Sequence, residues 1–74
     1  MNHVVQLKAR EQEAATALSR RVRAEYAEMP GLSVTLGQAQ RLWAVDRRTC
    51  EAVFTRLIAR GVLKVTAKGR IVRA

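Results

Sequence analysis

The sequence predicts a small α+β domain, mainly α, built from three helices and a C-terminal β-hairpin. Before Gly61, apolar side chains recur every three or four positions, which is typical of amphipathic helices. Pro30-Gly31 interrupts this pattern where a turn is expected. After Gly61 the chain changes to short runs rich in β-branched residues, which are typical of strands. With 74 residues, the chain is expected to form one domain around a compact core.

The first helix is expected from about Arg10 to Met29, because Ala, Arg and Glu dominate this segment and no glycine or proline precedes Pro30. Its buried stripe is expected at Ala15, Leu18, Val22, Tyr26 and Met29. Residues 1–9 show no clear cap and little periodicity, so we expect a flexible N-terminus. The folded domain then spans residues 10–74.

The second helix is expected from Leu36 to about Ala44. Thr35 is the expected N-cap, because Gln38 three residues later completes a capping-box pattern. The preceding residues 32–34 are expected to form either a short extended link or a brief edge strand.

The third helix is expected over residues 46–60. Asp46 stands at the N-cap, and Gly61 supplies the left-handed residue that ends the helix. Apolar side chains at i, i+3, i+4 and i+7 predict a buried stripe of Cys50, Val53, Phe54 and Leu57. The opposite face is mostly basic or small and carries Arg47, Arg48, Glu51, Ala52, Thr55 and Arg56.

Residues 62–73 are expected to form a β-hairpin around Ala67-Lys68-Gly69. Leu63 and Val65 fall on one face of the first strand, and Lys64 falls on the other. A hairpin alone is marginally stable, so this one must pack against the helices.

The net charge of +8 is unevenly distributed along the chain. Residues 1–35 hold five basic and four acidic side chains, whereas residues 36–74 hold nine basic and two acidic ones. A C-terminal half with a charge of +7 points to an anionic partner, and nucleic acid, an acidic membrane and an acidic protein are the candidates.

Several other classes of function find no support in the sequence. No apolar run approaches the roughly 18 residues of a membrane span, and no secretory signal is present, so a cytoplasmic protein without a membrane partner is expected. Cys50 is expected to be a buried thiol, and with His3 it forms no metal-ligand cluster. Neither a phosphate-binding glycine loop nor paired carboxylates nor a nucleophile with a nearby base is present. We therefore expect no enzyme activity, no cofactor and no metal.

The segment from Val45 to Arg73 resembles the winged helix-turn-helix domain of small bacterial proteins. The family pattern is an apolar turn residue, a capping residue, three apolar helix positions and a glycine, matched without a gap by Val45, Asp46, Cys50, Phe54, Leu57 and Gly61. An apolar pair and a basic hairpin follow, as Val62-Leu63 and Lys68-Gly69-Arg70. The N-terminal helix and residues 29–43 are similar as well, so the resemblance covers most of the chain.

The second helix departs from the family pattern. The family has an alanine three residues before a leucine that directly precedes a glycine and the turn residue, whereas Trp43 and Ala44 stand between Leu42 and Val45. Either the turn is one residue longer, or Trp43 takes the core position of the leucine, with Gln40 and Ala44 at the alanine and glycine positions. The second register needs no insertion, and we expect it.

The resemblance implies sequence-specific binding of double-stranded DNA by a nucleoid-associated transcription regulator. The recognition helix 46–60 would enter the major groove, and the wing 62–73 would meet the DNA backbone or the minor groove. The implied base contacts are Arg47, Arg48, Thr49, Glu51, Ala52 and Thr55. The implied contacts to the DNA backbone are Arg41, Arg56, Arg60, Lys68 and Arg70. Arg47 and Arg48 are the strongest base readers, because one guanidinium can bond both O6 and N7 of a guanine.

Alternatives to this interpretation stay open. The arginines of the third helix could be solvated surface residues, Thr49 only a first-turn residue, and Glu51 only an ion-pair partner of Arg47 or Arg48. The domain could also be a protein-interaction module whose basic face meets an acidic protein partner. RNA binding is disfavoured, because the chain has only three aromatic residues with which to stack bases.

The N-terminal helix is long for so small a core, so we expect it to be the surface of a homodimer.

Overall fold

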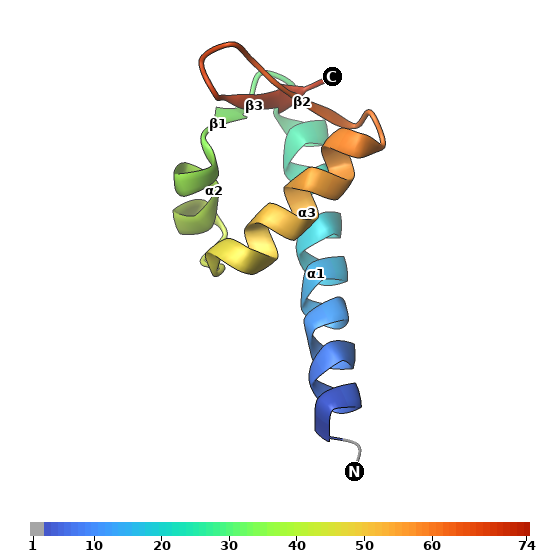
Figure 1. The fold of residues 1–74 in the computed structure, drawn as a ribbon. Helices are drawn as coiled ribbons and strands as arrows, with labels where there is room; N and C mark the ends of the chain where they lie inside the picture. The colour runs from blue at the N-terminus through green and yellow to red at the C-terminus, as the bar shows by residue number, and fades with distance from the viewer. Residues whose placement is uncertain (1–2) are drawn as a thin grey trace.

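The computed structural model describes the backbone of residues 3–74, together with the side chains of Arg10 and of residues 12–74. Three helices precede a hairpin whose second strand also pairs with a short strand between the first two helices (Figure 1). In chain order the elements are α1 (His3–Glu28), β1 (Ser33–Val34), α2 (Leu36–Leu42), α3 (Arg47–Ala59), β2 (Leu63–Val65) and β3 (Ile71–Arg73). This is a winged-helix-like α+β arrangement, and the predicted fold class is confirmed.

Helix α1 is longer than predicted at its N-terminal end. It begins at His3 rather than near Arg10, because no glycine or proline interrupts the segment between them. Residues 1–2 of the predicted flexible N-terminus lie outside the described residues. The 26 residues of α1 span about 39 Å, whereas the two shorter dimensions of the molecule are 21 and 20 Å. The N-terminal half of α1 therefore extends beyond the rest of the domain (Figure 1).

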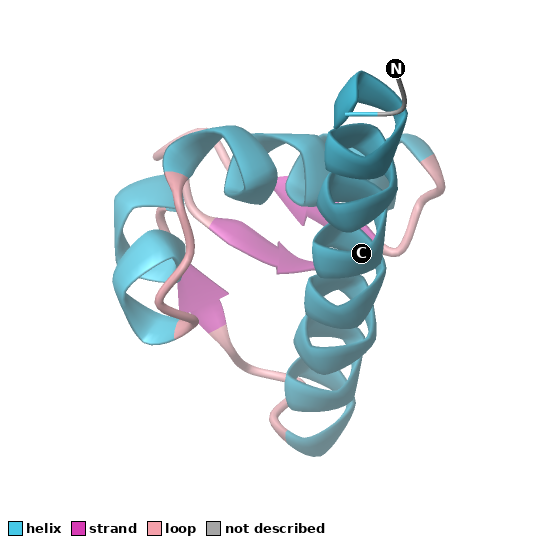
Figure 2. Cartoon of the chain, turned by 90° about the horizontal axis from the view of Figure 1, so that it is seen from below, coloured by secondary structure: helices cyan, strands magenta, loops and turns pink. Residues whose placement is uncertain are grey.

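The core lies where α1, α3 and the sheet meet. Helix α3 packs on α1 on one side and on α2 on the other (Figure 2). The predicted stripes are buried at Leu18, Val22 and Tyr26 of α1 and at all four positions of α3, from Cys50 to Leu57. Ala15 is only half-buried against this core, and the prediction for Met29 was wrong. Met29 is 46% exposed, because α1 ends at Glu28 and the chain turns away at Pro30.

The three strands form an antiparallel sheet in the order β1-β3-β2. Ser33 pairs with Val72 and Val34 with Ile71, so residues 33–34 form an edge strand rather than an extended link. Tyr26 fastens α1 to this sheet, since its hydroxyl donates a 2.7 Å hydrogen bond to the carbonyl of Ile71.

Both ends of α3 are fixed by local hydrogen bonds. The Asp46 carboxylate accepts the amide of Thr49 at 3.0 Å, as expected of an N-cap. At the C-terminal end, the amide of Gly61 donates to the carbonyl of Ile58 and the amide of Val62 to that of Leu57, which is a Schellman motif. Gly61 has φ of +76°, a conformation that glycine adopts without strain.

Helix α2 shows which register the chain adopts. The Thr35–Gln38 capping box is present, but the helix ends at Leu42 rather than near Ala44. Trp43 is buried and Leu42 is 51% exposed, so Trp43 does take the leucine's core position. Ala44 adopts φ of +51°, as expected of a residue at the glycine position. Gln40, which this register puts at the alanine position, is only half-buried.

Ala39 is the fully buried residue of α2, and Gln40 is only half-buried. Burial would remove the amide of Gln40 from water, whereas the methyl group of Ala39 is apolar. Trp43 then packs on α3 with its ring centroid 5.9 Å from that of Phe54.

Within the part of the chain that the structure describes, no helix is long and apolar enough to cross a membrane.

Candidate nucleic-acid interface

The outer face of α3 is exposed between α2 and α1. Burial of the stripe from Cys50 to Leu57 turns the opposite face of the helix outward. Most of the predicted contact residues of α3 are exposed there: Arg47, Arg48, Glu51, Ala52, Thr55, Arg56 and Arg60. The hydrogen bond from the Thr49 amide lowers the pKa of Asp46, so this N-cap carries its negative charge at neutral pH.

Arg47 and Glu51 form an ion pair one turn apart on this face. The Arg47 Nε lies 2.7 Å from the Glu51 Oε1, and the pair raises the pKa of Arg47. The two side chains are 75% and 47% exposed, and ion pairs in such positions contribute little to stability because water and salt screen them. Another anion can therefore displace Glu51 from Arg47. Among the described residues this is the only ion pair, which leaves Arg48 without an acidic partner there.

The α1 side of the face forms a shallow cleft. Arg48, Thr49 and Ala52 line it together with Asp46 and with Ala15 of α1, around a volume of about 240 Å³. Thr49 is half-buried here, whereas Arg48 and Ala52 are exposed. Of the six predicted base contacts, Thr49 is thus the one that the fold partly covers.

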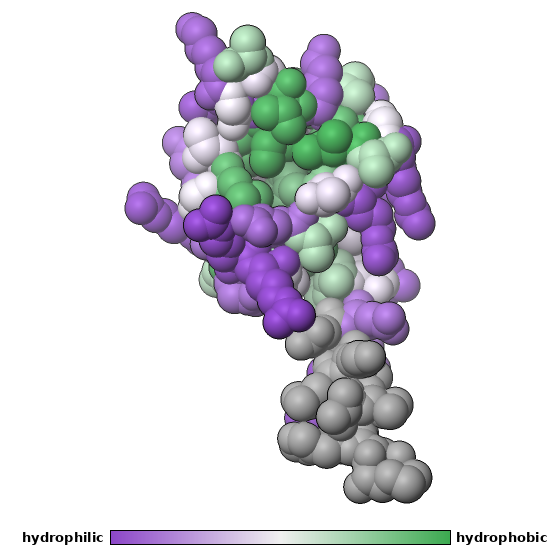
Figure 3. All heavy atoms as spheres, in the orientation of Figure 1, coloured by the Kyte–Doolittle hydropathy of each residue, from purple (hydrophilic) through white to green (hydrophobic). Residues whose placement is uncertain are grey.

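The hairpin side of the face forms a second hollow, which we call the α3–hairpin groove. It also encloses about 240 Å³ and is mainly apolar, lined by Leu36, Glu51, Phe54, Thr55, Ile58, Val65, Gly69 and Ile71. Hydrophobic atoms gather at this place between α2, α3 and the hairpin, with hydrophilic atoms around them (Figure 3). Glu51 and Thr55 therefore border an apolar surface that the sequence did not reveal.

The two predicted contacts of the hairpin differ in their surroundings. Lys68 is exposed in the loop between β2 and β3. Arg70 is half-buried, and its guanidinium donates from Nε to the Ser33 hydroxyl and from Nη2 to the Ser33 carbonyl, both at 2.7 Å. Arg70 thus ties the hairpin to β1. The other N–H groups of its guanidinium remain available to an anion, since arginine has five.

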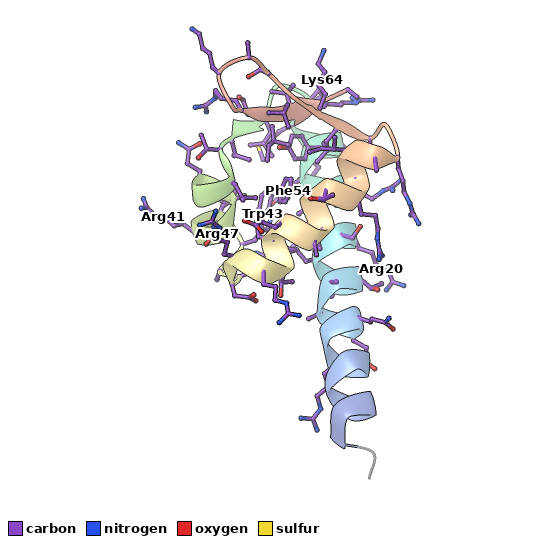
Figure 4. All side chains as sticks on the ribbon, viewed as in Figure 1. Arg20, Arg41, Trp43, Arg47, Phe54 and Lys64 are labelled. Atoms are coloured by element: carbon purple, nitrogen blue, oxygen red, sulfur yellow. The ribbon has the colours of Figure 1, made fainter. Side chains whose placement is uncertain are left out.

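The remaining basic residues extend the positive surface beyond α3. Arg41 is exposed on α2, on the same side of the view as Arg47, and Lys64 lies above the sheet (Figure 4). Lys64 and Arg73 are exposed on β2 and β3, although the sequence interpretation did not include them among the DNA-contacting residues. The alternation of side chains along β2 already placed Lys64 opposite Leu63, and this signal could have added it.

Few side chains at this interface are candidates for a reactive nucleophile or a metal ligand. Burial raises the pKa of the Cys50 thiol, and the nearby carboxylates of Asp46 and Glu51 raise it further. Within the described residues, no group of three His, Cys, Asp or Glu side chains could hold a metal ion. The side chain of His3 lies outside the described residues.

Fold and surface together define a winged-helix-like domain with a mainly basic third-helix face. Comparison of the chain with protein-family models, with curated proteins and with solved structures finds no match.

Proposed function

We propose that this protein binds double-stranded DNA sequence-specifically and acts as a transcription regulator. The observation that carries the proposal is the exposed face of α3, where Arg47 lies on the α2 side and Arg48 lines the cleft beside α1 (Figure 4). This face belongs to the half of the chain with nine basic and two acidic side chains. A helix of this kind fits the major groove, and the flanking basic residues can neutralise phosphates.

Each basic residue has a distinct role in the proposed complex. Arg48 reads a base, because among the described residues no acidic partner competes for its guanidinium. Arg47 reads a second base after it releases Glu51, whose carboxylate can then accept from a cytosine amine. The phosphate contacts come from Arg41, Arg56, Arg60, Lys68 and Arg70.

The test begins with selection of a preferred duplex from random DNA by the full chain. Replacing Arg47→Ala and Arg48→Ala together should weaken binding to that duplex by about 1–3 kcal/mol for each base-reading arginine removed, with little effect on an unrelated duplex. The matched control is Arg20→Ala with Arg21→Ala. It removes the same charge from exposed positions of α1, with Arg20 pointing away from α2 (Figure 4). Equal specific binding by wild type and the α3 variant would contradict the assigned base readers.

We also propose that two copies associate through α1. Among the described side chains of α1, Leu18 is the first buried one, and Gln12, Glu13, Ala14 and Thr16 before it are exposed, so these residues gain little from the core. Helices without tertiary packing are marginal in water, and a second copy would supply that packing. Sedimentation equilibrium of the full chain should give the mass of a dimer, and removal of residues 1–9 should shift the equilibrium toward monomer. A monomer mass for the full chain at working concentration would contradict this.

A further inference from the structure

The α3–hairpin groove differs in chemistry from the positive surface around it. Phe54 and Ile71 form its floor and are only 2% and 5% exposed. Leu36 and Ile58 are partly buried at its walls, and Val65 leaves 52% of its surface to solvent. Val65 lies on the same face of β2 as the buried Leu63, so the hairpin carries its apolar face outward past the core. The domain thus exposes an apolar hollow within its most basic half.

The groove is poorly suited to a phosphate group. Glu51 is its only charged lining residue, and that carboxylate already accepts from Arg47 at 2.7 Å. A phosphate placed in the hollow would meet apolar carbon atoms and a carboxylate, without a cation from the lining. Burial of an uncompensated charge is costly, so DNA binding alone leaves the groove unexplained.

The surroundings of the groove favour negative charge. Residues 36–74, which supply all of its lining, carry nine basic and two acidic side chains. Arg47 is ion-paired with the lining residue Glu51, and Lys68 is exposed in the hairpin loop beside the lining residue Gly69, so positive charge stands at more than one edge of the groove. The hollow of about 240 Å³ is smaller than the roughly 300–1,000 Å³ of ordinary small-molecule sites. A side chain from another protein is the occupant that fits both its size and its lining.

We propose that the α3–hairpin groove binds one bulky apolar side chain presented by an acidic segment of a partner protein. The apolar group would pack on Phe54 and Ile71, and flanking carboxylates would face Arg47 and Lys68. Glu51 and Thr55 line the groove and also belong to the proposed DNA face, so partner and duplex compete. The competition rests on the proposed function, whereas binding of the acidic segment does not.

The test uses a short synthetic peptide of Asp and Glu with one central Phe, and a second peptide with Ala at that position. Titration of the isotope-labelled full chain should shift the NMR methyl signals of Leu36, Ile58 and Val65 with the Phe peptide. The Ala peptide should bind at least about tenfold more weakly. Equal binding of the two peptides, or no binding of the Phe peptide, would overturn the proposal.

Two variants, each of which adds one negative charge, test whether the peptide binds in the groove. Val65→Asp places a carboxylate in the groove and should abolish the preference for Phe over Ala. Met29→Asp is the control, because Met29 is similarly exposed but does not line the groove. Both positions are exposed, so both variants should fold, which circular dichroism can verify. Equal weakening by the two variants would overturn the proposal, as would an unchanged preference for Phe over Ala in Val65→Asp.

Duplex binding is measured separately on the same proteins. If the wild type binds both ligands, unlabelled duplex should displace the Phe peptide. If the wild type binds the Phe peptide but no duplex, the groove proposal stands and the proposed DNA binding fails.

Discussion

Tyr26 is the only tyrosine of the chain, and it joins α1 to the sheet. Its ring is almost fully buried, and its hydroxyl donates to the Ile71 carbonyl at 2.7 Å. Burial disfavours the charged phenolate and raises the pKa of Tyr26 to about 12, from an ordinary value of 10.0. Since no other tyrosine is present, this ionisation can be followed by ultraviolet absorbance without overlap.

The raised pKa of Tyr26 predicts a loss of stability at alkaline pH. In the unfolded chain the phenol ionises near pH 10, whereas in the folded protein it keeps its proton until about pH 12. The stabilisation is therefore fully present below pH 10 and is lost as the pH rises toward 12. The free energy of unfolding, measured with urea, should therefore decrease between pH 10 and pH 12.

Tyr26→Phe provides the control for this prediction. The variant should lose about 1 kcal/mol near neutral pH with the hydrogen bond, and it should show a smaller further fall above pH 10. If the free energy of unfolding fell equally above pH 10 in both proteins, the loss would come from groups other than Tyr26, such as lysines.

At the scale of elements, the turn between α2 and α3 holds the third helix at its angle to the core. Ala44 adopts φ of +51° there, in the left-handed region that side chains disfavour. Its amide donates to the Arg41 carbonyl, and the next amide, of Val45, donates to the Gln40 carbonyl. The turn therefore keeps its backbone hydrogen bonds in spite of an unfavourable residue.

Glycine at this position should remove the strain. We predict that Ala44→Gly raises the free energy of unfolding by about 0.5–1 kcal/mol, since glycine adopts this φ readily. The reverse change, Gly61→Ala at φ of +76°, should lower it by about 1 kcal/mol. Chemical denaturation measures both. A destabilised Ala44→Gly would mean that the entropy glycine adds to the unfolded chain outweighs the strain.

The boundaries of elements were predictable where a short local pattern sets them. The Thr35–Gln38 capping box, the Asp46 cap and Gly61 each act within a few residues, so the sequence alone revealed them. The hydrogen bonds from Arg70 to Ser33 join residues far apart in the chain, and no local pattern indicates them. The exposure of Val65 also depends on how far the hairpin extends past α3, which only tertiary packing decides.

The candidate site was predictable to a similar degree. Helical periodicity placed Arg47, Arg48 and Thr55 on the outer face of α3. It could not show that Thr49 packs toward α1 or that the α3–hairpin groove is apolar, because both depend on neighbours from other elements.

At the scale of the whole molecule, the part that extends from the domain and the part that carries the positive charge are different. The N-terminal half of α1 extends from the rest of the domain, whereas the excess of basic residues lies on the surface of α2, α3 and the hairpin (Figure 1). In the proposed complex the phosphate contacts are thus confined to one half of the chain. Each such contact releases counterions from DNA, so their number can be counted from the salt dependence of binding.

The central claim is that the α3 side of the domain, rather than its net charge, binds DNA. The most direct test is the slope of log K against log salt for one duplex, measured by fluorescence titration. Five phosphate contacts predict a slope of about −4.5 for the wild type, and Arg56→Ala with Arg60→Ala should reduce it to about −2.7. Arg20→Ala with Arg21→Ala on α1 should leave it unchanged. Equal slopes for the two double variants, or a wild-type slope near zero, would contradict the account.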